Sequence, residues 1–177
     1  PIAKSWPSEF CLEANSLAIQ IHGGYGYTRE FPVEQYWRDN RLNMIHEGTH
    51  GIQALDLLGR KVVMNDGAAL AAMGRVVQAT MAQAQASATL APMAQALQHA
   101  WHDVMDSVQA LRPQLHSERE AVLANAHLFL EAFGHTVLAW TWLRQALVAQ
   151  HALDKGVDAT DEAFYRGKLQ AAQWFFR

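Results

Sequence analysis

The chain has 177 residues, of which 50% are hydrophobic and 18% are charged, and this composition excludes an intrinsically disordered protein. The net charge of -3 excludes the basic surface that a nucleic-acid-binding domain needs. The single cysteine, Cys11, excludes an internal disulfide and a cysteine-based metal site, and no apolar run is long enough to cross a membrane. We therefore expect a cytoplasmic protein without membrane contact.

The first 32 residues predict one helix and the turn that ends it. Over residues 8–21 apolar side chains recur at three- and four-residue steps, which is the spacing of one helix face. The glycines of residues 23–26 allow backbone conformations that end a helix, and Pro32 follows. The helix is therefore expected to end before Gly23. The residues that share this face are Phe10, Ala14, Leu17, Ala18 and Ile21.

Two more helices are predicted before residue 65. The first covers residues 33–45. Thr49 has a side chain typical of an N-cap, and the apolar stretch after it predicts a helix over residues 51–64. Within that helix one face is formed by Ile52, Leu55 and Leu58 or Gly59.

The sequence changes in character from about residue 65, where it becomes rich in Ala and Gln and nearly free of charge. Pro92 is expected to begin a helix that runs to about Leu111. Ser117 and Glu120 fit a capping box, which predicts the start of a long helix that ends near Leu153. A loop over residues 154–160 and a final helix over residues 161–176 follow.

Strand signals are nearly absent, because β-branched residues never alternate over a useful length. We therefore expect an all-α protein built as a helical bundle. Its two predicted parts are a helical section over residues 1–64 and an additional helical bundle over residues 65–177.

The stretch from His46 to His50 allows two interpretations. His46-Glu47-x-x-His50 fits the pattern in which two histidines one helical turn apart hold zinc and the glutamate acts as general base. Gly48 and Thr49, however, stand where that helix should be continuous, and both residue types favour a helix start. A zinc hydrolase is therefore one alternative function, and the presence of Gly48 and Thr49 inside the pattern argues against it.

In the second interpretation Glu47 lies just before a helix N-terminus, where unpaired backbone N–H groups present positive charge. A backbone N–H in this place can polarise a carbonyl while the carboxylate takes a proton. This combination suits proton abstraction next to a carbonyl group.

Residues 18–62 contain a series of elements in a definite order. The series is Gln20, Gly23-Gly24-x-Gly26-Tyr27, Pro32-x-Glu34, Arg38-Asp39, and Ile45-x-Glu47-Gly48-Thr49 followed by Ile52-Gln53. In this order and spacing, it closely resembles the C-terminal domain signature of the acyl-CoA dehydrogenases. The Ala-rich region after residue 65 resembles, more loosely, the extra helical region of longer members similar to 3-methylmercaptopropionyl-CoA dehydrogenase.

The resemblance implies an FAD-dependent α,β-dehydrogenation of an acyl-CoA thioester. It makes Glu47 the base that removes the α-proton while the β-hydrogen leaves as hydride to N5 of the flavin. The backbone N–H of Glu47, together with a flavin hydroxyl, would polarise the thioester carbonyl. Such a carboxylate needs a dry, closed site, in which its basicity rises when substrate binds.

The resemblance also implies the residues that bind the cofactor, and it implies no metal. Thr49 would contact FAD. Gln20 and the backbone of Gly23 and Gly24 would hold the FAD of a neighbouring subunit, which implies a homodimer or homotetramer.

Two positions depart from the family pattern. His46 stands where the family usually has Tyr, and this changes the polarity beside the base. Gly51 stands where many members have Gln, so one hydrogen bond to the cofactor is expected to be absent.

The family's N-terminal helical domain and middle β-barrel domain have no counterpart in these 177 residues, and the sequence begins at Pro1. We therefore expect a C-terminal fragment of an acyl-CoA dehydrogenase that is inactive by itself. For the whole enzyme the resemblance implies an acyl-CoA substrate and, as the usual electron acceptor, an electron-transfer flavoprotein.

A different class of function fits the region after residue 65. Its low charge and its Ala- and Met-containing faces suit burial against another subunit. The chain would then be a helical oligomerisation module without catalysis.

Overall fold

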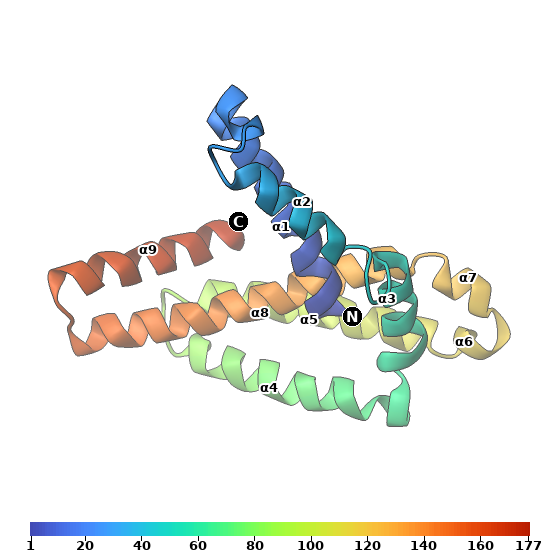
Figure 1. Ribbon diagram of the computed structural model, residues 1–177. Coiled ribbons are helices and arrows are strands. Elements are labelled where there is room, and N and C mark those ends of the chain that lie inside the picture. The colour runs from blue at the N-terminus through green and yellow to red at the C-terminus, as the bar shows by residue number, and fades with distance from the viewer. The chain divides into compact units, whose positions relative to one another are not determined.

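The computed structural model describes residues 1–177 and contains nine α-helices and no strand (Figure 1). The all-α fold predicted from the sequence is confirmed. The chain divides into two compact units. The first consists of Pro1–Val62 and Gln114–Gly134, and the second of Val63–Pro113 and His135–Arg177. None of the helices combines the length and the hydropathy that a membrane span requires.

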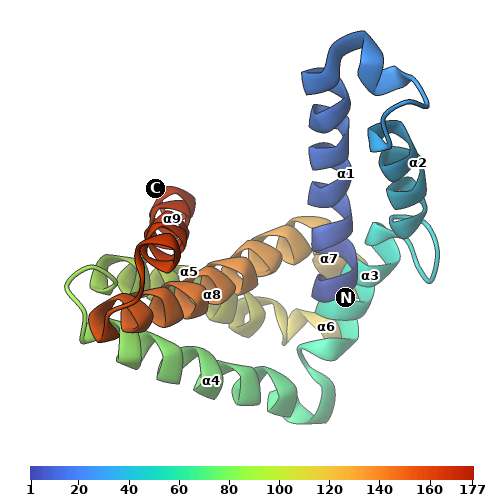
Figure 2. The ribbon, with the colours of Figure 1, turned by 60° about the vertical axis from the view of Figure 1, so that its left-hand side comes forward.

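The first unit begins with a helical hairpin. Helices α1 (Ile2–His22) and α2 (Val33–Asn43) lie side by side and run in opposite directions (Figure 2). The Asn40 side-chain amide donates to Oδ1 of Asn15 across the pair, at 3.1 Å. The short 3-10 helix η1 (Gly23–Tyr27) follows α1, so the glycines end the helix as predicted.

The start of α1 was predicted wrongly, and the apolar face of this helix is not buried. The helix begins at Ile2 rather than near residue 8, because its first turns are ordered by buried Ser5, Trp6 and Ser8. Leu17 and Ile21 of the predicted face are 56% and 83% exposed. The helical period is right, but only the first turns of α1 are buried.

Helix α3 (His50–Asp56) has Thr49 as its N-cap residue, as predicted, although the Thr49 side chain makes no capping hydrogen bond. The helix predicted over residues 51–64 changes to a π-helix, η2 (Leu57–Lys61), and a 3-10 turn, η3 (Met64–Gly67), follows. The wider π-turn rotates the buried face. Ile52 and Leu55, which lie in α3 before the π-helix, are exposed, and the residues buried in this stretch are Ala54, Leu57, Leu58 and Val62.

Residues 114–134 complete the first unit with short helices. These are α6 (Gln114–Ser117), α7 (Arg119–Leu123) and the beginning of α8 (Ala126–Lys155). The predicted capping box is wrong, since Glu118 is the N-cap of α7 and makes no side-chain capping bond. The chain turns here because this brings both Leu115 and Val122 into buried positions.

The second unit is built around the hairpin of α4 (Ala68–Gln85) and α5 (Ala91–Leu111), with Pro92 in the first turn of α5 as predicted. The buried residues of α5 recur at helical steps and include Met93, Leu97, Trp101, Val104 and Val108. Gly74 of α4 allows a close approach, because a Cβ there would lie 3.3 Å from Cζ2 of Trp101. From α8, the Trp140 indole N–H donates to the Thr80 hydroxyl of α4 at 2.9 Å.

The last helix, α9 (Ala159–Phe175), begins two residues earlier than predicted because Asp158 caps it. The Asp158 carboxylate accepts hydrogen bonds from the backbone N–H groups of Thr160 and Asp161, at 2.9 and 3.0 Å. Ala172 is the one residue of α9 that is buried, so packing contributes little to this helix.

Replacing Asp158 with Ala is expected to destabilise α9 by about 1 kcal/mol, because two backbone N–H groups lose their acceptor. Amide hydrogen exchange of residues 159–165 measures the effect directly. The Asp158→Asn variant keeps the acceptor oxygen and serves as the control. Equal protection in the Ala and Asn variants would show that the cap does not stabilise α9.

Candidate active site

The turn between α2 and α3 contains the residue predicted as the catalytic base. Glu47 has a φ of 54° and Gly48 a φ of 94°, so both lie in the left-handed region. Thr49 then returns to φ -65° and ψ 168° at the start of α3. A left-handed conformation is uncommon for a residue with a side chain, and such strain clusters at functional sites. Both Glu47 and Thr49 are exposed.

Side chains from two helices hold this turn in place. The Gln53 side-chain amide of α3 donates to the Glu47 carbonyl oxygen at 3.0 Å. The Lys4 ammonium group of α1 donates to the Gly48 carbonyl oxygen. Sequence reasoning missed both bonds. Gln53 lies inside the recognised motif, but no pattern in the sequence points to Lys4.

The geometry that H-E-x-x-H requires is not present. His46 lies before α3 and His50 is its first residue, and the left-handed backbone of Glu47 and Gly48 separates them. The two imidazoles therefore do not lie one turn apart on a single helix. Nδ1 of His46 lies 2.9 Å from the Leu42 carbonyl oxygen. The zinc-hydrolase interpretation is wrong for this reason.

His50 instead packs against α1. Its Nε2 lies 3.1 Å from the Ser8 hydroxyl, and its Nδ1 lies 3.4 Å from the Glu9 carboxylate. Burial lowers the pKa of His50, and the nearby Glu9 carboxylate opposes that shift. His50 thus connects the start of α3 to the first turns of α1.

The residues predicted to hold FAD from a neighbouring subunit lie at the end of α1 and in η1. Gln20 is exposed near the C-terminus of α1. A Cβ at Gly23 or Gly24 would meet nothing within 4 Å, so the backbone is open to a ligand there. Gly26 is different, because a Cβ would lie 2.5 Å from the Ile19 carbonyl oxygen. This glycine lets η1 pack closely on α1.

The predicted site residues form two groups rather than one. Lys4 contacts the Glu47–Thr49 turn near the N-terminus of α1, whereas Gln20 lies near its C-terminus. With a helical rise of about 1.5 Å per residue, Lys4 and Gln20 are separated by about 24 Å along the axis. Glu47 and Thr49 therefore lie at one end of the α1–α2 hairpin, and Gln20, Gly23 and Gly24 lie at the other.

The Arg38-Asp39 element of the motif lies on α2. The Arg38 guanidinium donates to the Glu34 carboxylate one turn earlier, at 2.7 Å. This hydrogen bond lowers the pKa of Glu34 and raises the pKa of Arg38. Arg38 and Glu34, which both belong to the family motif, therefore orient each other on the same face of α2.

Replacing Gly48 with Ala is expected to destabilise the first unit by about 1 kcal/mol or more, because the left-handed backbone is strained for Ala. The new Cβ would also lie 2.9 Å from Nε2 of Gln53, whose amide holds the turn. Urea unfolding measures the change. Gly51→Ala is the matched control, since a Cβ there meets nothing within 4 Å and α3 favours Ala. Equal midpoints for the two variants would contradict the described turn.

Comparison with protein families accounts for nearly the whole chain. The model of the acyl-CoA dehydrogenase C-terminal domain matches residues 1–63, and the model described as acetyl-CoA dehydrogenase C-terminal like matches residues 67–177. The chain belongs to the acyl-CoA dehydrogenase family. The resemblance inferred from residues 18–62 is therefore confirmed.

Individual relatives agree with this membership. A broad-specificity linear acyl-CoA dehydrogenase, FadE5 of Mycobacterium tuberculosis, is 32% identical over 99% of this chain. The 3-methylmercaptopropionyl-CoA dehydrogenase of Ruegeria pomeroyi is 33% identical over 99% of the chain. CarC of Acetobacterium woodii, a subunit of the caffeyl-CoA reductase-Etf complex, is 47% identical over 33% of the chain and 15% of its own length. The chain spans 30% and 29% of the lengths of the first two.

Proposed function

We propose that the chain is the C-terminal helical part of an FAD-dependent acyl-CoA dehydrogenase, an oxidoreductase that acts on the α,β carbon–carbon bond of an acyl-CoA thioester. The observation that carries the proposal is the left-handed backbone of Glu47. This residue lies in the recognised motif, within residues 1–63, which the acyl-CoA dehydrogenase C-terminal domain model matches. The names of the relatives support the substrate class.

In this proposal Glu47 is the general base. Its carboxylate takes the proton from the α-carbon, and its backbone N–H polarises the thioester carbonyl, which acidifies that carbon. The hydrogen bond from Gln53 to the Glu47 carbonyl oxygen and the bond from Lys4 to Gly48 fix the backbone on which both groups depend. Bound FAD supplies the hydride acceptor.

The residues at both ends of the hairpin fit a role in holding FAD. Thr49 presents an exposed hydroxyl that makes no capping bond, so the hydroxyl can serve a cofactor. Gly23 and Gly24 present open backbone, which a cofactor can approach closely. Because the two groups lie at opposite ends of α1, we assign them to two different flavins, one of them bound by a neighbouring subunit.

The surface around Gln20 supports assembly into a homodimer or homotetramer. Ile21, Tyr25 and Tyr27 are large apolar residues at this end of the hairpin, and all are exposed. Exposed apolar side chains gathered in one place mark an interaction surface. An electron-transfer flavoprotein is the proposed electron acceptor, and the name of the relative CarC, a subunit of a complex with Etf, supports it.

A second candidate function is a helical oligomerisation module. Phe164 and Trp174 of α9 are exposed, which favours contact of this helix with another chain. The molar mass of the chain in solution tests this candidate. A strict monomer at high concentration would exclude it.

The visible absorbance of protein mixed with FAD tests the main proposal. It should be recorded for this chain and for a polypeptide extended on its N-terminal side to the length of the relatives. We expect the extended protein to be yellow and to lose its flavin absorbance when acyl-CoA is added. We expect this chain alone not to react. An extended, folded protein that takes up no FAD would overturn the proposal.

A further inference from the structure

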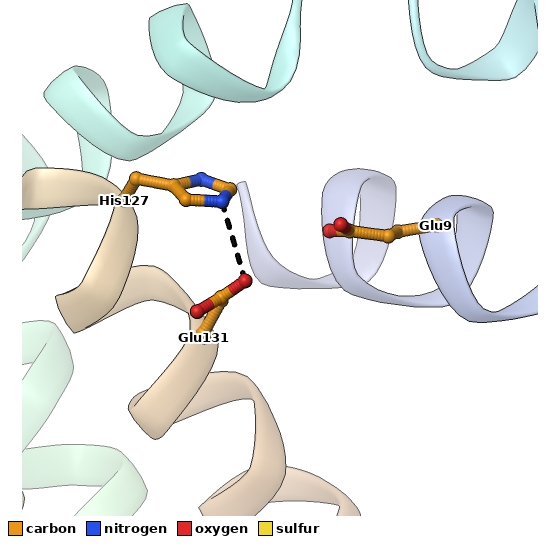
Figure 3. Close-up of side chains that lie close together, drawn as sticks. All are labelled: Glu9, His127 and Glu131. Atoms are coloured by element: carbon orange, nitrogen blue, oxygen red, sulfur yellow. Dashed lines mark ion pairs between the residues drawn. The ribbon is translucent and has the colours of Figure 1, made fainter.

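Three side chains with metal-binding atoms converge in the first unit, outside the Glu47 turn. Glu9 belongs to α1, and His127 and Glu131 belong to the first two turns of α8 (Figure 3). One ligand atom from each residue can be chosen so that all lie within 4.8 Å of one another. The Glu9 side chain points from α1 toward the His127–Glu131 pair, as Figure 3 shows.

We propose that Glu9, His127 and Glu131 form a binding site for a zinc ion. Imidazole nitrogen and carboxylate oxygen are typical zinc ligands, at about 2.0–2.2 Å from the metal. Around one tetrahedral ion such atoms lie roughly 3.3 Å apart, so ligand atoms within 4.8 Å can close on it by side-chain rotation. Three protein ligands leave the fourth position for water.

The helix geometry of α8 preorganises two of the ligands. His127 and Glu131 are four residues apart, so they lie one above the other on the same face. Nε2 of His127 is 3.2 Å from the Glu131 carboxylate. A divalent cation placed between them would replace this contact by two bonds to the metal.

Glu9 makes the cluster different from an ordinary surface pair. On α5, His102 and Asp106 have the same four-residue spacing and lie 3.3 Å apart, but they belong to no three-ligand group. Their side chains are 74% and 59% exposed, whereas those of His127 and Glu131 are 47% and 39% exposed.

The Glu9 carboxylate also has a neighbour that orients it. Nδ1 of His50 lies 3.4 Å from the Glu9 carboxylate, and the His50 side chain is only 11% exposed. Residues that contact a metal-binding carboxylate help to fix its direction and strengthen the site. The proposed ion would connect α1 to α8 within the first unit, so its binding would add to the stability of that unit.

Isothermal titration of zinc chloride into the chain, in a buffer that does not chelate metals, tests the proposal. We expect one zinc ion per chain. Glu9→Gln and His127→Gln should each weaken the affinity by about tenfold or more. His102→Gln removes a histidine from the matched pair on α5 and should leave the affinity unchanged.

Two further observations decide between a built site and a surface pair. Zinc should raise the melting temperature of the original chain and should raise it much less in Glu9→Gln, with far-UV circular dichroism confirming that both are folded. Unchanged zinc affinity in Glu9→Gln would overturn the proposal, because α8 alone would then hold the metal. Absence of saturable binding, or equal weakening by His102→Gln, would overturn it as well.

Discussion

Glu47→Gln is expected to lower the rate of acyl-CoA dehydrogenation by about 10²–10⁴-fold, because an amide cannot take the α-proton. The amide preserves the size of the side chain, so FAD and substrate should still bind. The measurement is the rate at which flavin absorbance bleaches after anaerobic mixing with acyl-CoA. It requires the extended polypeptide, in which we expect the whole active site.

The control for this variant is Glu120→Gln. Glu120 is exposed on α7, and the substitution removes the same charge. The flavin of the Glu120→Gln variant should therefore bleach at the same rate as that of the unsubstituted protein. If Glu47→Gln bleached as fast as the Glu120 variant while binding the same amount of FAD, Glu47 would not be the base. Loss of FAD from the Glu47 variant alone would instead assign this residue to cofactor binding.

Gly134→Ala is expected to destabilise the first unit strongly, because the added methyl group has no room beside α1. A Cβ at residue 134 would lie 2.2 Å from Cδ1 and 2.7 Å from Cγ of Trp6. Trp6 is buried and stacks on Phe10, with ring centroids 3.9 Å apart, so it cannot move without losing packing. Overpacking of this kind costs about 1–3 kcal/mol.

Gly167→Ala provides the opposite case. Gly167 lies inside α9, and a Cβ there would meet nothing within 4 Å. The same substitution should therefore stabilise its helix by about 0.5–1 kcal/mol. Chemical unfolding followed by Trp fluorescence and by circular dichroism compares the two variants. A stabilising effect of Gly134→Ala would contradict the close approach of α8 to Trp6.

The position of a helix end was predicted correctly from the sequence where a single residue determines that position. Gly23 ends α1, Thr49 precedes α3, and Pro92 lies in the first turn of α5, all because of local backbone chemistry. The capping box at Ser117 failed because the burial of Leu115 and Val122 decides the path of the chain there. Burial depends on residues far away in sequence, which a local pattern does not contain.

The same distinction applies to the candidate site. The sequence placed Glu47 just before a helix N-terminus, and this is confirmed because α3 begins at His50. It did not indicate the bond from Lys4 or the contacts of His50 with Ser8 and Glu9, which join positions more than 40 residues apart. The roles of Glu47, Gln20, Gly23, Gly24 and Thr49, and the division between residues 64 and 65, stay predictions.

The discontinuous first unit has a consequence for the order of folding during synthesis. Its core needs residues 114–134, which leave the ribosome only after the α4–α5 hairpin is complete. That hairpin joins neighbouring helices through a short connection, so it can form early at a small cost in loop entropy. The N-terminal helices cannot complete their packing, and Trp6 stays exposed to solvent, until Gly134 has been synthesised and packs against it. During that interval the uncovered apolar surface of the first unit makes the nascent chain prone to aggregation and to chaperone binding.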